Sequence, residues 1–373
     1  MRVLHLLSST GFHGAENMAA ALIRQLAACG VENHVGIFRS HEGSNTELLQ
    51  VVREVIQGGE IIDCHGKFDW RAFRVLRRYV REHKIDVVHS HKYKTNFYAV
   101  VACFGLPSAL VSTCHNWLGT GAKMRFYAAL DKRILRMFDR VVGVSNEVTI
   151  ELRRHMVAEK VVKIDNGIEV QRFGGTPKSE ALRMLGLGAR PVVGFVGRLS
   201  ADKAVSHLLQ AARALVSRGL AIDLVVTGDG ECAQSLHAEA RDLGVGEYVH
   251  FLGRRDDTPA IYAAMDVFVL PSLKEAFPIV LLEAMAAGVP VVATEVGDAS
   301  YILEDGACGV LVEAGDIAAL SHAIEKLLTD SDKARRLGSA GRWRVRQRFS
   351  SIAMAERYRE LYKDALGIRC GVS

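Results

Sequence analysis

Short runs of apolar residues alternate along the chain with longer segments in which apolar residues recur every three or four positions. Runs of the first kind are typical of buried strands, and segments of the second kind are typical of amphipathic helices. In the first half, the strand-like runs are "RVLHLLS", "NHVGIF", "IDVVHSH", "SALVSTCHN", "RVVGVS" and "KVVKIDNGI". This regular alternation predicts a parallel sheet with helices on both faces.

The alternation is interrupted near residue 170 and then begins again. After the irregular "EVQRFGGTPKSEALRMLGLGAR", the strand-like runs are "PVVGFVGRLS", "IDLVVTGDGE", "YVHFLGR", "DVFVLPS" and "PVVAT". A length of 373 residues is enough for two domains with separate cores. We predict one domain over residues 1–170 and a second over residues 171–351, followed by a charged amphipathic helix over residues 352–373.

Composition fits a globular protein without a membrane span. Apolar residues make up 49% of the chain and charged residues 24%, and no apolar run approaches the ~20 residues that a spanning helix needs. "MRVLHLLSST" is interpreted as a strand because its apolar core is too short for a signal peptide. The seven cysteines are scattered and lack a C-x-x-C pair, which favours reduced thiols in a cytosolic protein.

The net charge of +5 is concentrated in the first half of the chain. Residues 1–170 carry 23 Lys and Arg against 17 Asp and Glu, whereas residues 171–373 carry 24 against 25. A basic half suits an anionic membrane surface, a nucleic acid or an anionic substrate. No nucleic-acid recognition module is apparent, so nucleic acid is not an expected partner.

Two stretches of the first half combine arginines with aromatic residues at helical spacing, Lys67–Lys84 and Lys123–Arg140. Such helices could rest on an anionic bilayer and meet a lipid-linked acceptor. The alternative is an ordinary core face beneath a solvated basic face. In the first stretch that core face would consist of Trp70, Phe73, Leu76 and Val80.

The stretch "KEAFPIVLLEAMAAGVPVVAT" places two carboxylates, Glu275 and Glu283, in apolar surroundings. Pro278 suits the first turn of a helix and Gly288 its end, so Glu275 is expected on a strand-to-helix loop and Glu283 inside the helix. A helix N-terminus attracts phosphate, and a carboxylate can accept hydrogen bonds from vicinal hydroxyls. The stretch therefore suits a ligand with both phosphate and sugar. The alternative is that Glu283 faces solvent and Glu275 caps the helix.

In the second half, three further loops that follow predicted strands contain glycine or charged residues. "GRLSADK" offers Arg198 and Lys203, whose charges suit a diphosphate, although a solvated loop is the alternative. "GDGE" permits a tight turn and close approach of the backbone to a ligand, and "FLGRRDD" supplies another glycine. The G-x-G-x-x-G and P-loop spacings are both missing, which disfavours an NAD-dependent oxidoreductase.

Histidines follow two strands of the first half. His115 closes "VSTCHN" and could donate a hydrogen bond to a sugar or a phosphate, with a structural role as the alternative. His89 and His91 could form half of a metal site. No partner cluster is evident in the sequence, so no metal is expected.

In their order along the chain, these loops resemble those of the family 4 retaining glycosyltransferases. The resemblance covers essentially the whole chain and is densest from Gly194 to Gly315, where the Glu-x7-Glu element in its full context is a strong signal. It implies an α/β GT-B fold: two Rossmann-like, doubly wound domains that face each other across a cleft, with the C-terminal helix returning toward the N-terminal domain. The matching stretches are "GFHGAE", "DVVHSH", "CHN", "VVGVS", "NGIE", "GFVGRLSADK", "VVTGDGE", "VHFLGR" and "PSLKEAFPIVLLEAMAAGVPVVAT".

The resemblance also implies roles for individual residues. The N-terminal domain would serve the acceptor, through His13 and Glu16, and residues 166–167 would lie near a hinge. The catalytic positions are His115 near the reacting carbon, Glu275 at the transferred sugar, and Arg198 and Lys203 on the diphosphate. The donor-binding positions are Gly14, Gly197, Gly228, Gly253, Arg254, Ala276, Phe277, Pro278, Ile279, Val280 and, on the ribose hydroxyls, Glu283.

The chain departs from the family pattern at two positions. His13 and Ala276 stand where the family usually has glycine. Both changes reduce the freedom of the backbone near the donor.

The expected activity is transfer of a sugar from a nucleotide-sugar, UDP-linked first and GDP-mannose second, to a hydroxyl of a glycan or lipid-linked acceptor with retention of configuration. The resemblance implies no metal or other cofactor, because cationic side chains and helix dipoles stabilise the leaving diphosphate. The expected setting is surface polysaccharide or glycolipid synthesis in the cytoplasm or at the inner face of the membrane. A nucleotide-sugar epimerase of the same fold and a non-catalytic scaffold are the alternatives.

Overall fold

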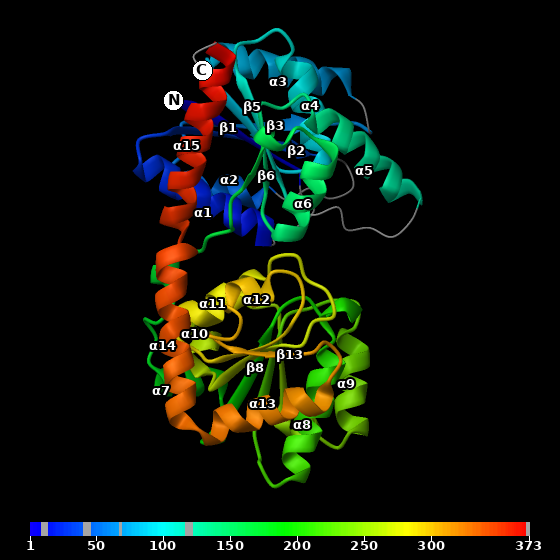
Figure 1. Ribbon diagram of the computed structural model, residues 1–373, viewed down its shortest axis with the longest axis vertical. Helices are drawn as coiled ribbons and strands as arrows, with labels where there is room; N and C mark the ends of the chain where they lie inside the picture. The colour runs from blue at the N-terminus through cyan, green and yellow to red at the C-terminus, as the bar shows by residue number, and fades with distance from the viewer. Residues whose placement is uncertain (9–13, 40–45, 67–68, 116–121, 371–373) are drawn as a thin grey trace. The chain divides into compact units, whose positions relative to one another are not determined.

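The computed structural model describes residues 1–8, 14–39, 46–66, 69–115 and 122–370. The chain divides into two compact units, Met1–Gly167 with Ser351–Ser373 and Ile168–Ser350 (Figure 1). The boundary predicted after residue 170 thus falls after Gly167, and the one predicted after residue 351 falls after Ser350. Among the described helices, none combines the length and the apolar character needed to cross a bilayer.

The first unit is built on a seven-stranded parallel sheet with the strand order β3-β2-β1-β4-β5-β6-β7. The order reverses between β1 and β4, and right-handed crossovers therefore place the connecting helices on opposite faces. The last strand covers only part of the predicted run over residues 160–168. The strands are β1 (Arg2–Leu7), β2 (Glu32–Arg39), β3 (Gly58–Asp63), β4 (Val87–Ser90), β5 (Ala109–Cys114), β6 (Arg140–Gly143) and β7 (Val161–Lys163).

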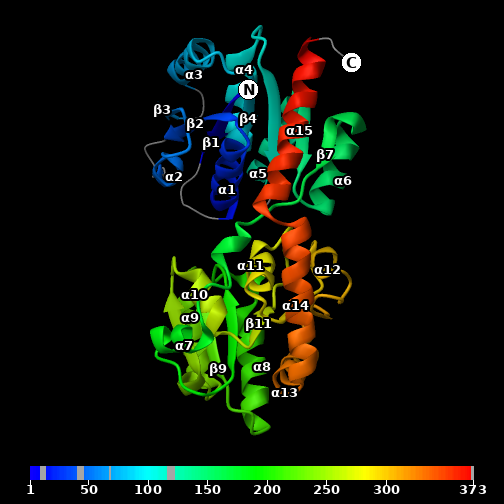
Figure 2. The ribbon, with the colours of Figure 1, turned by 90° about the vertical axis from the view of Figure 1, so that its left-hand side faces the viewer.

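Within the described ranges of the first unit, seven helices cover this sheet. Successive residues of β1 point to opposite faces of the sheet. Val3 packs with α1 and α15 on one face, and Leu4 and Leu6 pack with α3 and α4 on the other. Figure 2 shows α1 beside α15, which contact each other. The helices are α1 (Gly14–Ala28), α2 (Glu47–Val52), α3 (Trp70–Glu82), α4 (Tyr93–Cys103), α5 (Ala122–Leu135), α6 (Asn146–His155) and α15 (Ser351–Cys370).

The C-terminal helix α15 is anchored to the strands of the first unit by two buried tyrosines. The Tyr358 hydroxyl lies 2.8 Å from Thr113 Oγ1, and the Tyr362 hydroxyl lies 2.8 Å from His89 Nδ1. Both tyrosine side chains also pack in the apolar core between α1 and the sheet. The last helix of the chain therefore belongs to the N-terminal unit, as the resemblance implied.

The second unit repeats this architecture with a six-stranded parallel sheet in the order β10-β9-β8-β11-β12-β13. The strands are β8 (Val192–Val196), β9 (Asp223–Thr227), β10 (Val249–Gly253), β11 (Val267–Leu270), β12 (Val291–Thr294) and β13 (Val310–Val312). The helices are α7 (Lys178–Leu185), α8 (Val205–Ser217), α9 (Ala233–Asp242), α10 (Thr258–Ala264), α11 (Ile279–Ala287), α12 (Ala299–Ile302), α13 (Ile317–Thr329) and α14 (Ser331–Arg348).

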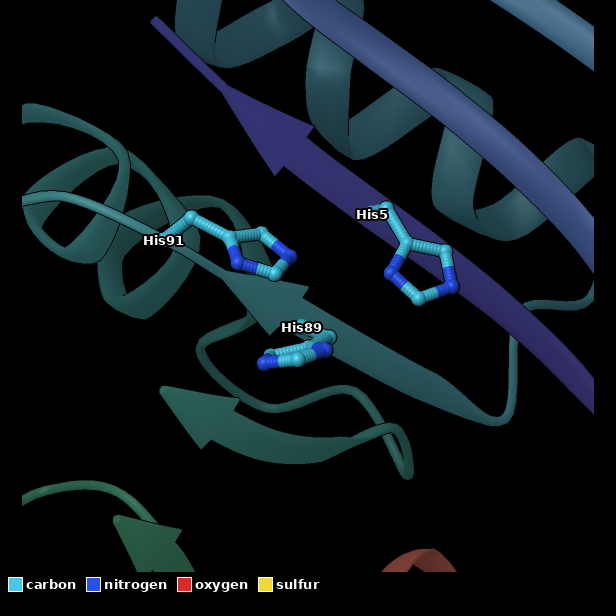
Figure 3. A group of neighbouring side chains, drawn as sticks. All are labelled: His5, His89 and His91. Carbon is cyan, nitrogen blue, oxygen red and sulfur yellow. The ribbon is translucent and has the colours of Figure 1, made fainter. Parts of the chain in front are cut away.

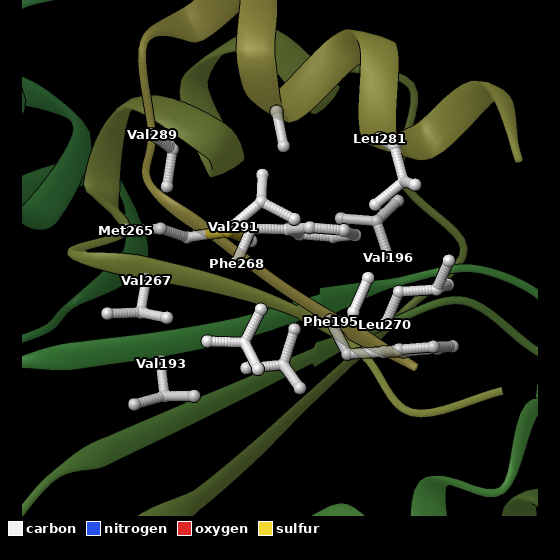
Figure 4. Close-up of a cluster of buried hydrophobic side chains, with 14 of the residues drawn as sticks. Val193, Phe195, Val196, Met265, Val267, Phe268, Leu270, Leu281, Val289 and Val291 are labelled. Carbon is white, nitrogen blue, oxygen red and sulfur yellow. The ribbon is translucent and has the colours of Figure 1, made fainter. Parts of the chain in front are cut away.

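The core of the second unit is made of large apolar side chains from the sheet and from α11. Figure 4 shows Phe195 of β8 and Phe268 of β11 beneath Leu281 of α11, and all three side chains are fully buried. Burying one such side chain stabilises the fold by about 1.5–3 kcal/mol. The strand that carries Phe268 is therefore firmly fixed, and with it the loop that leads into α11.

The pattern of apolar residues missed two strands, and both lie at sheet edges. β3 begins with two glycines and has exposed residues at every second position, and β13 has only three residues. An edge strand packs on fewer neighbours and needs less apolar surface, so its signal in the sequence is weak.

Candidate active site

Three of the predicted glycines lie side by side where neighbouring strands end. Gly197 follows β8, Gly228 follows β9 and Gly253 ends β10. The Gly197 amide donates to the Thr227 carbonyl oxygen over 2.9 Å, and the Gly228 amide donates to the Gly253 carbonyl oxygen over 2.9 Å. The three loops therefore form one continuous backbone surface at the carboxyl edge of the sheet, the edge at which such folds bind ligands. Arg254 is exposed beside this surface.

Gly228 allows the closest approach within this surface. Its φ of +135° is essentially restricted to glycine, and a Cβ built on it would lie 1.8 Å from the Gly197 carbonyl oxygen. The glycines of "GDGE" are thus required by packing of backbone on backbone.

The predicted phosphate-binding lysine and the first glutamate contact each other. Lys203 Nζ lies 2.5 Å from Glu275 Oε1, and the Ser272 hydroxyl donates to the same oxygen over 2.8 Å. The carboxylate is largely buried, so it is held between an ammonium group and a hydroxyl with little access to water. Arg198, the second predicted cation, is exposed on the loop after β8. The structure therefore joins two residues that are 72 positions apart in the chain.

The loop from Glu275 to α11 presents backbone rather than side chains. Phe277 and Pro278 are buried, and Ile279 and Val280 in the first turn are half-buried. Pro278 was predicted inside the first turn, but the helix begins one residue later at Ile279. Within the part of the chain that the structure describes, the Ile279 and Val280 amides have no hydrogen-bond partner, whereas the Leu281 amide donates to the Pro278 carbonyl oxygen over 3.1 Å. The amides of this turn carry the positive end of the helix dipole. A phosphate or a sugar oxygen would find donors there.

Gly297 supports this loop from behind, a role that no motif in the sequence indicates. The Asp298 amide donates to the Ala276 carbonyl oxygen over 3.0 Å. A Cβ on Gly297, whose φ is +54°, would lie 2.3 Å from the Glu275 carbonyl oxygen. The backbone of Glu275 and Ala276, two residues of the predicted nucleotide-sugar site, therefore packs directly on position 297, where only glycine fits.

Glu283 lies one turn inside α11 and points at Tyr262 of α10. The Tyr262 hydroxyl donates to Glu283 Oε2 over 2.8 Å. Burial raises the pKa of the Glu283 carboxyl, and the Tyr262 hydrogen bond and the Arg172 charge oppose that rise. The alternative in which Glu283 faces solvent and Glu275 caps the helix is wrong, because both carboxylates have specific buried partners.

In the first unit, His115 directly follows β5, and its Nε2 is buried without a hydrogen-bond partner among the described residues. Burial lowers the pKa of His115 to about 4, with the nearby Glu16 carboxylate opposing this change. Glu16 is buried in the first turn of α1 and lies 3.0 Å from Lys92 Nζ, a partner that the sequence did not suggest. Gly14 is the first residue of α1, and His13 lies outside the described residues.

His89 and His91 have a third histidine beside them, contrary to the prediction that they lack a partner cluster. Figure 3 shows His5 on β1 and His91 on opposite sides of His89, and ligating atoms of the three lie within 4.8 Å of one another. Such a set could hold a metal ion. Both ring nitrogens of His89 already bond to hydroxyls, however, and the His91 ring packs against the His89 ring, tilted by 40° with centroids 4.1 Å apart. The absence of a metal remains a prediction.

These histidines make folding sensitive to mild acid. Burial lowers the pKa of His5 to about 4 and the pKa values of His89 and His91 well below 6.5. The unfolded chain therefore takes up protons first as the pH falls. The contribution of these histidines to the free energy of unfolding is fully present above about pH 6.5. Below that pH it decreases by about 1.4 kcal/mol per pH unit for each histidine.

We expect the free energy of unfolding, measured with urea, to fall steeply between pH 6.5 and 5. His91→Leu should make this fall shallower because it removes one buried imidazole, whereas the exposed control His322→Gln should leave it unchanged. Equal unfolding free energies at pH 7 and pH 5 in the unmodified chain would contradict this account.

Both halves of the chain are similar to known protein families. Two family models match the chain: Glycosyltransferase Family 4 over residues 12–172 and Glycosyl transferases group 1 over residues 183–344. The two matches fall on the first and the second unit. Together they contain the whole second sheet, the first sheet except β1, and the candidate donor-side and acceptor-side residues described above.

Individual relatives agree with the family models. A D-inositol 3-phosphate glycosyltransferase of Thermobispora bispora is 32% identical over 311 residues, which are 76% of this chain and 71% of the relative. An Escherichia coli relative, UDP-Gal:alpha-D-GlcNAc-diphosphoundecaprenol alpha-1,3-galactosyltransferase, is 26% identical over 310 residues, 79% of this chain and 80% of its own length.

Among solved structures, HepE of Anabaena in complex with UDP superimposes with a TM-score of 0.85 and 23% identity, over 97% of this chain and 100% of HepE. This likeness confirms the predicted fold of two doubly wound α/β units, the GT-B architecture. From the family models, the relatives and the fold, we conclude that the chain belongs to the family 4 glycosyltransferases.

Proposed function

We propose that this glycosyltransferase transfers a sugar, with retention of configuration, from a nucleotide-sugar to a hydroxyl of a glycan or a lipid-linked acceptor. UDP-sugars are the first choice of donor and GDP-mannose the second. The setting would be the synthesis of a surface polysaccharide or a glycolipid. The second unit would bind the donor, and the first unit, with Glu16 and His115, would serve the acceptor and the reacting sugar.

The observation that carries this proposal is the convergence of Lys203, Glu275 and the start of α11. An ammonium group and the helix amides of Ile279 and Val280, which are unpaired among the described residues, lie at one edge of a parallel sheet, with carboxylates on either side. Cations and helix dipoles suit a diphosphate, and carboxylates suit sugar hydroxyls. A nucleotide-sugar carries both groups in one molecule.

Two relatives support the choice of uracil. The E. coli relative is named for UDP-Gal, and HepE has been crystallised with UDP and with UDP-glucose. Their names also support a polysaccharide or glycolipid setting, because the E. coli relative acts on a sugar-diphosphoundecaprenol.

The mechanism follows from what the residues of the second unit can do. Lys203 and the amides of α11 would stabilise the charge that develops on the diphosphate as the glycosidic bond breaks. A leaving phosphate oxygen would then accept the proton of the attacking hydroxyl on the same face of the sugar, which retains the configuration. The protein supplies position and charge, so we expect transfer to persist in EDTA.

Thermal unfolding in the presence of UDP, GDP, ADP and NAD tests the proposal. A ligand at 100 times its Kd stabilises by about 2.7 kcal/mol, a shift of a few degrees. We expect a shift with one nucleoside diphosphate, UDP before GDP. No shift with any of the four, or a shift with NAD alone, would contradict the proposal.

Helix α3 supports a membrane-facing surface on the first unit. Phe73, Leu76 and Val80 are buried as the core interpretation predicts, but Trp70 is 63% exposed. The Arg74 guanidinium lies 5.9 Å from the Trp70 ring centroid. Four exposed arginines follow one side of the helix: Arg71, Arg74, Arg78 and Arg81. An aromatic ring beside a basic stripe suits the interface of an anionic bilayer.

The second basic stretch is less available, because Lys132 pairs with Glu151 and Arg140 with Asp364. We therefore expect Trp70→Ala combined with Arg74→Ala to weaken binding to phosphatidylglycerol vesicles about tenfold, measured by co-sedimentation. Trp343→Ala, which removes an equally exposed tryptophan from the second unit, should have no effect. Vesicle binding that does not depend on the content of anionic lipid would contradict the proposal that α3 faces an anionic membrane.

A further inference from the structure

One neighbouring side chain determines how Glu283 is presented. Tyr262 is fully buried, and its hydroxyl donates to Glu283 Oε2 over 2.8 Å. Glu283 Oε1 accepts no hydrogen bond from the residues that the structure describes. One carboxylate oxygen is thus fixed from within the protein, and the other stays available to a ligand.

The tyrosine ring is fixed in turn by aromatic contacts. It lies edge-on to Phe173 with centroids 5.9 Å apart and tilted against Phe268 with centroids 5.6 Å apart. Both phenylalanines belong to the buried core of the second unit. With its ring clamped, the Tyr262 hydroxyl can point only toward α11, and the donor to Glu283 is preorganised.

The environment of this pair keeps the tyrosine protonated, so that its hydroxyl can donate to Glu283. Burial and the Glu283 carboxylate raise the pKa of Tyr262 well above 10, so its hydroxyl keeps its proton. Burial also raises the pKa of Glu283, and the hydrogen bond from Tyr262 works against this rise. A carboxylate that must accept from two sugar hydroxyls has to be ionised, because a protonated one is itself a donor.

We propose that Tyr262 is a positioning residue for the donor site: its hydroxyl holds Oε2 of Glu283 and so turns Oε1 toward the ribose hydroxyls. The proposal rests on the proposed function, in which Glu283 binds the ribose of the nucleotide. It assigns a role to a residue that the sequence alone does not distinguish from an ordinary core tyrosine.

Tyr262→Phe tests this role because it removes only the hydroxyl. Kd values for UDP and its 2′-deoxy counterpart dUDP, or for GDP and dGDP if guanine binds better, would be measured between about pH 5 and 8. We expect the preference for the ribose form to fall about fivefold to tenfold. The midpoint of the acid-side loss of affinity should move upward by about one pH unit, because the carboxylate loses a donor. In turnover, the KM for the donor should rise while kcat stays unchanged.

Two variants serve as controls. Glu283→Gln should abolish both the ribose preference and the acid-side dependence, and Tyr262→Phe should add nothing in that background. Tyr248→Phe removes a tyrosine hydroxyl beside a different carboxylate, that of Glu247, and should bind both nucleotides like the unmodified chain. Thermal unfolding of each variant shows whether its fold is intact, and the split between KM and kcat separates positioning from a loss of folded protein.

The failure of this inference differs from the failure of the proposed function. If the unmodified chain binds neither UDP nor GDP, the proposed function is wrong. If it binds one of them, and a folded Tyr262→Phe keeps both the ribose preference and the pH midpoint, the role of Tyr262 is overturned.

Discussion

Replacing Lys203 by alanine should lower kcat/KM for sugar transfer by about 100-fold to 1000-fold, the range typical for removal of one preorganised group that stabilises transition-state charge. Lys203 Nζ lies 2.5 Å from Glu275 in a largely buried setting, so its charge is held at the start of α11. The variant loses the cation that meets the leaving diphosphate and leaves Glu275 without its ion-pair partner. The measurement is steady-state release of nucleoside diphosphate.

The matched control is Lys274→Ala, which removes an exposed lysine from the same loop as Glu275. We expect it to change turnover less than threefold, because an exposed charge acts weakly through solvent. Thermal unfolding of both variants separates lost activity from lost fold. Near-normal turnover in a folded Lys203→Ala variant would remove Lys203 from the site.

The second large effect is expected on stability. Gly228→Ala places a Cβ 1.8 Å from the Gly197 carbonyl oxygen and forces alanine to a φ of +135°. Neither group can move aside, because both belong to backbone at the ends of core strands. We expect the free energy of unfolding to fall by more than about 3 kcal/mol, measured with urea, together with loss of nucleotide binding.

Gly253→Ala is the control for this effect. Gly253 also has a positive φ, +65°, but a Cβ on it meets no atom within 4 Å. Its replacement should cost only about 1–2 kcal/mol, the strain of a left-handed alanine. Similar losses in the two variants would show that close packing of Gly228 on Gly197 is unimportant.

The sequence predicted the architecture well because a doubly wound sheet buries its central strands on both faces. Runs such as "PVVGFVG" and "DVFVLPS" are apolar throughout, and they became β8 and β11 at the centre of their sheet. The same rule explains why β3 and β13 were not predicted. Both lie at sheet edges, where a strand needs fewer apolar residues. Helix ends were predicted less closely, since Pro278 was expected inside the first turn of a helix that begins at Ile279.

The candidate site was predictable where its chemistry sits in loops and was not where it depends on contacts across the fold. Lys203 and Glu275 could be found because charged residues follow apolar strands. Tyr262 and Gly297 could not, because a tyrosine in an apolar helix and a single glycine in a loop fit ordinary packing. His5 was overlooked because it lies inside a strand, far in sequence from His89 and His91.

The most direct test of the account is proton NMR of the reaction mixture with the donor that thermal unfolding identifies and a polyprenyl-diphosphate-sugar acceptor. We expect one nucleoside diphosphate to be released for each new glycosidic bond, and the product to have the same anomeric configuration as the donor. A donor that changes its sugar stereochemistry without any acceptor would instead indicate an epimerase. A product of inverted configuration, or a donor that is never consumed, would contradict retaining sugar transfer by this chain.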